Sequence, residues 1–266
     1  MAENKKLYNK SWALILGGSS GLGLASAKKL AKEGYNICVV HRDRRSVMDQ
    51  REEDFQEIKS MGVQFLNFNV DALNGEKRQE VLTALKEKMG EGESLRALIF
   101  SIARGNLKPL TGEGESSLSN DDFHMTLESM AISLYDWVKA IFGAGLFAAD
   151  SRIISFTSEG NRKVWKNYAA VSAAKAALES ISRSIALEFA PYGIRCNCIQ
   201  AGMTDTESFR MIPGNEALKK YTLARNPFQR MTTPEDVANV VFLLCTPEAA
   251  WINGAVIPVD GGEQNQ

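Results

Sequence analysis

The stretch Ala13-Leu14-Ile15-Leu16-Gly17-Gly18-Ser19-Ser20-Gly21-Leu22-Gly23 decides the fold of this chain. A short apolar run ends in a glycine-rich loop, and apolar residues then recur at helical spacing from Leu24 to Glu33. Glycines let the backbone approach a ligand closely, and the first N–H groups of a helix attract anions. Glycines also serve ordinary strand-to-helix turns, so the spacing alone is a weak signal. Its place after a first strand favours a bound nucleotide.

Apolar runs of the same kind alternate with helical segments along the rest of the chain. Because these runs are continuous rather than alternating, they predict strands buried on both faces of a parallel sheet. The pattern therefore predicts an α/β fold, a Rossmann-like doubly wound parallel sheet of about seven strands with helices on both faces. The further strands are expected in Ile37–Val40, Val63–Val70, Leu98–Phe100, Ile153–Phe156, Ile194–Ile199 and Val256–Val259, and further helices in Val81–Lys88, Ala169–Phe189 and Asp236–Leu244.

Composition and length favour one domain over residues 1–266. Hydrophobic residues make up 44% and charged residues 24% of the 266 residues, at a net charge of −1, so no basic field favours a nucleic acid. We find no linker or internal repeat, and Thr111 to Asn120 is typical of a polar loop. The first residues show no secretory signal, and the longest apolar run, Ala140 to Ala149, is too short for a membrane span. We therefore expect a cytoplasmic protein.

The cysteine and histidine content argues against a metal site. Cys196 and Cys198 lie two residues apart, so they share one face of a predicted strand, either as a metal or redox pair or as small buried hydrophobes. The second interpretation is favoured because no C-x-x-C pair occurs and the only two histidines are His41 and His124.

The end of the second predicted strand bears on the choice of dinucleotide. A site that prefers NAD places an acid there, which accepts a hydrogen bond from the 2′-hydroxyl of the adenosine ribose. Here His41 takes that place and Arg42 follows, and a guanidinium suits a 2′-phosphate. Asp43 keeps an NAD(H) site open, because its carboxylate is near enough to turn to the ribose. We expect NADP(H) to be preferred, with NAD(H) possible.

A tyrosine and a lysine begin the long helical segment after the fifth strand. A free tyrosine has a pKa near 10, and a nearby ammonium lowers it and makes proton transfer useful. Tyr168 and Lys175 therefore suggest a site of proton transfer. Their spacing alone would also fit an aromatic cap and an exposed lysine.

With these motifs in place, the chain from Leu14 to Gly262 resembles the short-chain dehydrogenases/reductases. The motifs that carry the resemblance stand in the family's order: Gly17-x-x-x-Gly21-x-Gly23, Asn69-Val70, Ser101-Ile102-Ala103, Ser158, Tyr168 with Lys175, Ala201-Gly202 with Thr206, and Val259-Asp260-Gly261-Gly262.

Two departures narrow the resemblance. Ketone-reducing members carry Tyr-x-x-x-Lys, whereas this chain has Val171 four residues before Lys175 and its tyrosine at Tyr168. The segment Ser101-Ile102-Ala103-Arg104 replaces the usual Asn-Asn-Ala-Gly. Both features resemble the enoyl-acyl-carrier-protein reductases, most of all the NADPH-using branch of Bacillus-like bacteria. The resemblance implies hydride transfer from NADPH to the β-carbon of a trans-2-enoyl thioester in fatty-acid elongation, with acyl carrier protein as partner.

The longer Tyr-to-Lys spacing has a physical rationale. On an ideal helix seven residues rise about 10.5 Å and return nearly to the same face, so both side chains would point together. When an enoyl thioester accepts hydride at its β-carbon, negative charge develops on the thioester oxygen, two carbons further along. A proton donor displaced along the helix is consistent with that demand.

Two rival functions remain open. Ser158 stands where ketone reducers keep a catalytic serine, so a 3-oxoacyl-thioester or general carbonyl reductase using Ser158 and Tyr168 is the alternative of the same fold. Met130 occupies the stretch where ketone reducers place a structural asparagine, which counts against it. A dinucleotide-sensing regulator without catalysis is the alternative from another class, and the retention of both Tyr168 and Lys175 argues against it.

By position, the resemblance assigns the residues of the site. Segment 205–230 mixes apolar side chains with Pro213-Gly214 and is expected to form a substrate-binding loop that closes over an apolar chain. Stretches 119–142 and 169–189 and the Asp260-Gly261-Gly262 ending resemble parts that form homotetramers. The expected catalytic residues are Tyr168, Lys175 and Ser158; the cofactor-binding residues are Gly17, Ser19, Ser20, Gly21, Leu22, Gly23, Arg42, Asn69, Val70, Ser101, Ile102, Ala103, Lys175, Gly202, Thr204 and Thr206; the substrate-binding residues are Arg104, Met203, Phe209, Met211 and Ile212.

Overall fold

The computed structural model describes residues 8–112, 116–212 and 214–266, and its centre is one parallel sheet. Seven strands pair in the order β3-β2-β1-β4-β5-β6-β7, which confirms the predicted doubly wound α/β fold. Residues 113–115 of the predicted polar loop lie outside the described residues. The strands are β1 (Ser11–Leu16), β2 (Asn36–His41), β3 (Phe65–Asn69), β4 (Ser94–Phe100), β5 (Phe147–Thr157), β6 (Ile194–Ala201) and β7 (Val256–Val259).

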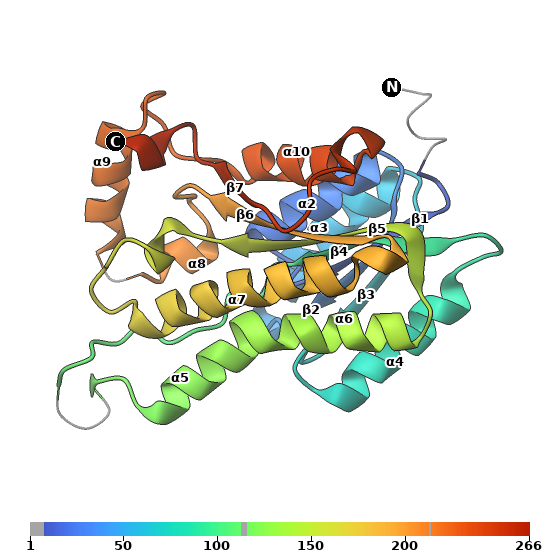
Figure 1. Ribbon diagram of the computed structural model, residues 1–266, viewed down its shortest axis with the longest axis horizontal. Coiled ribbons are helices and arrows are strands. Elements are labelled where there is room, and N and C mark those ends of the chain that lie inside the picture. The colour runs from blue at the N-terminus through green and yellow to red at the C-terminus, as the bar shows by residue number, and fades with distance from the viewer. Residues whose placement is uncertain (1–7, 113–115, 213) are drawn as a thin grey trace.

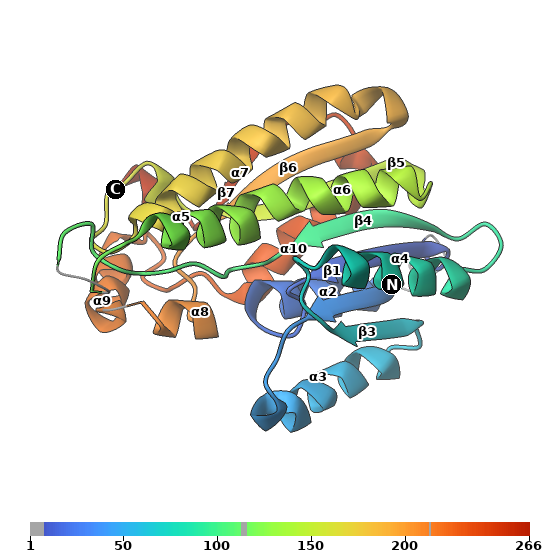
Figure 2. The same ribbon diagram turned by 90° about the horizontal axis from the view of Figure 1, so that it is seen from below.

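Helices cover both faces of the sheet (Figure 1). Two shorter helices lie beyond the carboxyl ends of the strands, within the predicted substrate-binding loop (Figure 2). One face carries α4 (Gly75–Lys88), α5 (Asn120–Leu127), α6 (Ser133–Gly143) and α7 (Ala169–Glu188); the other carries α2 (Gly21–Lys32), α3 (Met48–Ser60) and α10 (Pro234–Cys245); the shorter pair is α8 (Glu207–Arg210) and α9 (Asn215–Arg225).

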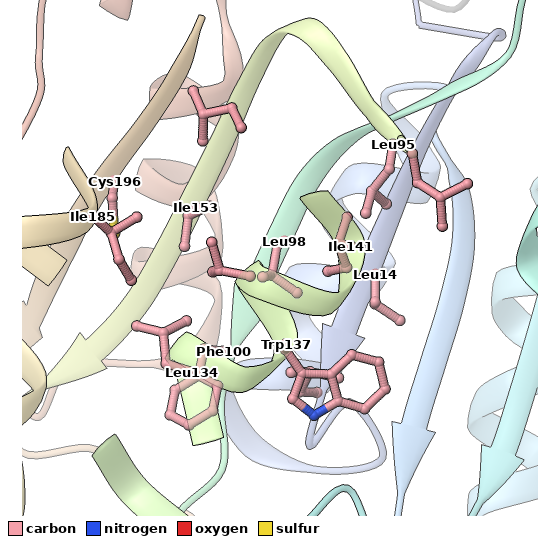
Figure 3. Packing of buried hydrophobic residues seen from close by; sticks show 14 of the residues in the cluster. Leu14, Leu95, Leu98, Phe100, Leu134, Trp137, Ile141, Ile153, Ile185 and Cys196 are labelled. Atoms are coloured by element: carbon pink, nitrogen blue, oxygen red, sulfur yellow. The ribbon is translucent and has the colours of Figure 1, made fainter. Parts of the chain in front are cut away.

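Successive residues of the central strands belong alternately to two separate hydrophobic clusters. Leu14 points to the face covered by α6, where Trp137 is fully buried, and Ile15 points to the face covered by α2 and α10. Figure 3 shows the first cluster, with Leu98, Ile153 and other strand residues packed against α6. Because both faces are buried, the strands read as continuous apolar runs in the sequence.

The order of the strands fixes where a ligand can enter. The chain leaves β1 in one direction toward β2 and β3, and from β4 it continues in the other direction. At such a switch point the connections after the two central strands diverge and leave a crevice at their carboxyl ends. The glycine loop follows β1 at this edge, so the sequence signal and the topology point to the same place.

Two further features bear on the sequence predictions. All four cysteines are free and buried, so they pack as small hydrophobic residues. Within the residues that the structure describes, no helix combines the length and the apolar character needed to cross a bilayer.

Candidate active site

A cavity of about 480 Å³ opens at the carboxyl edge of the sheet and gathers most of the predicted site residues. It runs from the glycine loop and the end of β2, past the ends of β4 and β5, to the loop 205–230. The predicted residues on its wall are Gly17, Ser19, Ser20, Gly21, Leu22, Arg42, Val70, Ser101, Ile102, Ala103, Arg104, Ser158, Tyr168, Lys175, Gly202, Met203, Thr204, Thr206, Phe209 and Ile212.

Three predicted residues do not lie on this wall. Gly23 packs beneath the loop, where a Cβ atom would stand 2.2 Å from the carbonyl oxygen of Gly17. Asn69 exchanges hydrogen bonds of 3.0 and 3.1 Å with the backbone of Asp43, so it braces the turn after β2. Met211 is 78% exposed. None of these three residues lines the cavity, so any effect of theirs on a ligand is exerted through neighbouring residues.

The glycine loop has the shape and the free donors that a dinucleotide pyrophosphate requires. Gly17 has φ +80°, and a Cβ there would lie 2.6 Å from the carbonyl oxygen of Ser101. Ser20 is the N-cap of α2, its side chain makes no capping hydrogen bond, and the first turn of α2 has no acidic residue. The N–H groups at this helix start are therefore available to an anion. The residues present fit a nicotinamide dinucleotide.

Charged residues crowd the adenosine end of the cavity. The Arg42 guanidinium lies 2.7 Å from the carboxylate of Asp71. The Asp43 carboxylate lies 2.7 Å from Nδ1 of the buried His41 and 3.3 Å from Nε of Arg51. The pKa of Asp43 is lowered: burial alone would raise it, but hydrogen bonds from Ser19 and His41 and the charge of Arg51 outweigh burial. Asp43 is therefore an ionised and fully engaged carboxylate.

An ion pair joins this end of the cavity to the predicted substrate-binding loop. Nη2 of Arg51 on α3 donates to both carboxylate oxygens of Glu207 on α8, at 2.8 and 2.9 Å. The Arg51 side chain is 7% exposed and that of Glu207 is 60% exposed. Residues 156 positions apart in the chain thus hold the loop against the cofactor half of the site.

Tyr168 and Ser158 bring two hydroxyl groups together on the wall. Their oxygens lie 3.4 Å apart, and the ring of Tyr168 packs on Trp165 with 5.1 Å between ring centroids. Gly160 permits this packing, since a Cβ there would lie 2.5 Å from Cε1 of Tyr168. Burial raises the pKa of Tyr168, and the hydrogen bond with Ser158 only partly offsets it. The phenol is therefore protonated at neutral pH and suited to donate.

Lys175 is not paired with Tyr168 as the helix geometry had suggested. Tyr168 is the N-cap of α7, with φ −114° and ψ 3°, so the rise and rotation of an ideal helix do not apply between them. Nζ of Lys175 donates to the carbonyl oxygen of Phe156 at 2.6 Å, and no hydrogen bond joins it to Tyr168 in the described part of the chain. Burial lowers the pKa of Lys175 to about 8, and the negative charge of Glu179 opposes only part of that lowering. The expected lowering of the Tyr168 pKa is absent.

The substrate half of the cavity has an apolar wall with a charged rim. Apolar side chains from Leu107, Met130, Trp165, Val171, Met203, Phe209 and Ile212 line it. Arg225 on α9 pairs with Glu159 at 3.1 Å and lies 3.6 Å from the buried Glu263. Burial and the charge of Glu159 raise the pKa of Glu263. This arrangement suits an apolar chain that passes beneath the loop.

Sequence reasoning missed several residues of the wall. Some follow directly on predicted motif residues, and that adjacency is a signal: Asp71 follows Val70, Glu159 follows Ser158, and Glu263 follows Gly262. Trp165 lies in a stretch that carried no motif, whereas Ser129 directly precedes Met130. Ser129 belongs to the π-helical turn Glu128–Ile132 between α5 and α6, and its hydroxyl donates to the carbonyl oxygen of Arg104. No group of three potential metal ligands occurs among the described residues.

Comparison with known proteins agrees with this geometry at the level of the family. Residues 17–264 match the family model described as "Enoyl-(Acyl carrier protein) reductase". The fold, glycine loop and Ser-Tyr-Lys set define an oxidoreductase of the short-chain dehydrogenase/reductase class. This chain belongs to the enoyl-(acyl carrier protein) reductase family within that class.

Individual relatives carry different activities. The chain is similar to the enoyl-[acyl-carrier-protein] reductase (NADH) of Aquifex aeolicus VF5, with 28% identity, a TM-score of 0.83 and 98% of each chain covered. It is 28% identical to the cyclohexanol dehydrogenase of Rhodococcus sp. (strain TK6), over 98% of each chain. It is 28% identical to the 3-oxoacyl-[acyl-carrier-protein] reductase MabA of Mycobacterium tuberculosis, over 94% of this chain and 91% of the relative.

Proposed function

We propose that this protein is an NADPH-dependent enoyl thioester reductase that acts on trans-2-enoyl chains bound to acyl carrier protein in fatty-acid elongation. The observation that carries the proposal is the identity of the residue four positions before Lys175. Val171 stands there, 6% exposed and on the cavity wall, and it has no group that can exchange a proton. The phenol of Tyr168 is set three residues further from Lys175.

Each residue has a defined task in this reaction. A nicotinamide dinucleotide, when bound, would supply the hydride for the β-carbon of the substrate. Tyr168 holds its proton at the thioester oxygen, where negative charge develops, and its raised pKa keeps that proton in place until it is needed. Lys175 binds the hydroxyls of the nicotinamide ribose with the charge that it carries below pH 8. Phe209 and Ile212 cover the chain and exclude water.

The preference for NADPH rests on the two charged residues after β2. Arg42 is half exposed and its guanidinium can form paired hydrogen bonds with a 2′-phosphate. Asp43, which would serve a 2′-hydroxyl, is already engaged by His41 and Arg51. NAD(H) is the second cofactor in this proposal, and the Aquifex relative is described as an NADH enzyme.

The competing proposal is a 3-oxoacyl-thioester reductase. The separation of 3.4 Å between the oxygens of Ser158 and Tyr168 favours it, since two hydroxyls could share one ketone oxygen. The activity of the MabA relative supports it as well. Reduction of crotonyl and acetoacetyl thioesters, each with NADPH and with NADH, separates the two. Consumption of NADPH with the crotonyl thioester alone supports the enoyl reductase, and consumption with the acetoacetyl thioester alone would transfer the assignment to the ketone reducer.

We also propose that the protein works as a cytoplasmic homotetramer. Large apolar side chains are exposed on α6 and on the end of α7, in the two stretches that resemble tetramer-forming parts of the family. They include Tyr135, Phe142 and Leu187. Burial of such side chains between copies of the chain is favourable. Light scattering after size exclusion tests this, and a monomer at micromolar concentration contradicts it.

A further inference from the structure

We propose that Asp71 sets the preference of this site between phosphorylated and unphosphorylated dinucleotides, by holding Arg42 and by placing a negative charge where the 2′-phosphate would lie. The inference rests on the dinucleotide binding proposed above and concerns a residue that the Asn69-Val70 motif does not include. Asp71 is thus a specificity-determining residue rather than a catalytic one.

Asp71 lies between two arginines on the cavity wall. Nη1 of Arg42 approaches its Oδ2 to 2.7 Å, and Nη1 of Arg104 lies 3.8 Å from the same oxygen. Its other oxygen accepts a hydrogen bond of 3.0 Å from the backbone N–H of Leu73. The side chains of Arg42, Asp71 and Arg104 are 52%, 38% and 44% exposed, so all three can meet a ligand.

The neighbouring acid cannot take over this task. Asp43 is 14% exposed, and its two oxygens face His41 and Arg51, which would each lose a partner if it turned to a ribose. Apart from Glu207, whose carboxylate binds Arg51, this leaves Arg42, Asp71 and Arg104 as the half-exposed charges on the described wall of the adenosine end. The sum of their charges is +1.

The Asp71 carboxylate would interact differently with the 2′-phosphate of NADPH and the 2′-hydroxyl of NADH. A 2′-phosphate carries a charge between about −1.5 and −2 near neutral pH, so the Asp71 carboxylate repels it and also competes with it for Arg42. A 2′-hydroxyl is neutral and can donate to the same carboxylate. Interactions of exposed charges are small and are screened by salt. Asp71 therefore moderates the preference for NADPH that Arg42 creates, and removal of its charge increases that preference.

Binding measurements test this without any turnover. Wild type, Asp71→Asn, Arg42→Ala and the double variant are titrated with NADPH and NADH by fluorescence, and with 2′,5′-ADP and 5′-AMP by calorimetry, at low and at high salt. The last two ligands differ only in the 2′-phosphate and lack the nicotinamide. The control is Glu87→Gln, which removes one exposed negative charge near the end of α4, away from the cavity.

We expect Asp71→Asn to tighten NADPH and 2′,5′-ADP about three- to tenfold and to change NADH and 5′-AMP less than about twofold, with the gain shrinking at high salt. We expect Glu87→Gln to leave the ratio of the two affinities unchanged. In the Arg42→Ala background the effect of Asp71→Asn should become smaller, because part of it acts through Arg42.

Other outcomes separate the two proposals. Equal changes for both cofactors, or weaker NADPH binding in Asp71→Asn, overturn the role of Asp71 and leave the proposed reaction untouched. If wild type binds both dinucleotides but reduces neither thioester, the proposed reaction fails while the binding cycle still decides on Asp71. If wild type binds no dinucleotide, both proposals fall.

Discussion

Gly160→Ala should displace the side chain that we assign as proton donor. An added Cβ would stand 2.5 Å from Cε1 and 3.0 Å from Cδ1 of Tyr168, and 3.1 Å from Cζ3 of Trp165. Carbon atoms in ordinary contact lie about 3.5–4 Å apart. The ring must therefore move by about 1 Å to restore an ordinary contact distance. The backbone of Gly160 is outside the left-handed region, so strain in the new alanine is not the cause.

The size of the effect follows from that displacement. A misplacement of about 1 Å in a reacting group costs about 10²-fold in rate. The movement also changes the distance of 3.4 Å between the oxygens of Tyr168 and Ser158. Overpacking of this kind costs about 1–3 kcal/mol in the free energy of unfolding. We expect a fall in kcat of about 10²-fold, a modest drop in Tm and an unchanged Kd for NADPH.

The assay is steady-state turnover with the better of the crotonyl and acetoacetyl thioesters, together with NADPH titration and thermal unfolding. Gly75→Ala is the matched control, because a Cβ at Gly75 meets only the end of the Arg78 side chain, at 3.8 Å, and this glycine begins α4 without lining the cavity. Turnover within about threefold of wild type in Gly160→Ala would refute the placement of Tyr168 as the donor.

Three further predictions concern the same site. Tyr168→Phe should lower kcat by about 10²–10³-fold with little change in the Kd for NADPH, whereas Lys175→Met should weaken NADPH binding as well; stopped-flow and fluorescence titration separate these, and near-normal turnover in Tyr168→Phe would move the role to Ser158. In the protein without ligand the pKa of Lys175 is about 8, and ribose hydroxyls favour its charged form. The affinity for NADPH should therefore be full below pH 8 and fall as the pH rises above it. The same pH profile in Lys175→Met would contradict this. Hydrogen exchange in segment 205–230 should slow when NADPH and a substrate analogue are added, and protection that is already strong without ligand and does not change would exclude a closing loop.

The fold could be predicted because its signals are local. Each strand is a continuous apolar run, and the burial of Leu14 and Ile15 on opposite faces of the sheet explains why the runs do not alternate. Helix α3 has a sequence pattern that is hard to recognise. Its sequence is mostly charged and amide residues, and its buried side chains are only Arg51, Phe55 and Ile58. A helix that buries so little apolar surface leaves a weak periodic signal.

The site could be predicted where contiguous motifs build it. The glycine loop and the segment after β4 meet in space because they follow two parallel neighbouring strands, β1 and β4, whose carboxyl ends lie at the same edge of the sheet. The pairs Arg42–Asp71 and Arg51–Glu207 could not be predicted, since each joins elements that only the folded chain brings together. The expected helical relation between Tyr168 and Lys175 was wrong for a local reason, because α7 begins one residue after Tyr168.

The ion pair between Arg51 and Glu207 joins the two halves of the cavity, so a ligand that breaks it in one half would change binding in the other. A ligand in the substrate half that displaces Glu207 would leave Asp43 as the remaining charged partner, among the described residues, of Arg51, whose side chain is 7% exposed. A ligand at the adenosine end that moves Arg51 releases the loop in turn. Linkage requires that each ligand change the affinity of the other by the same factor. Fragments for the substrate half of the cavity should therefore be screened in the presence and absence of saturating dinucleotide.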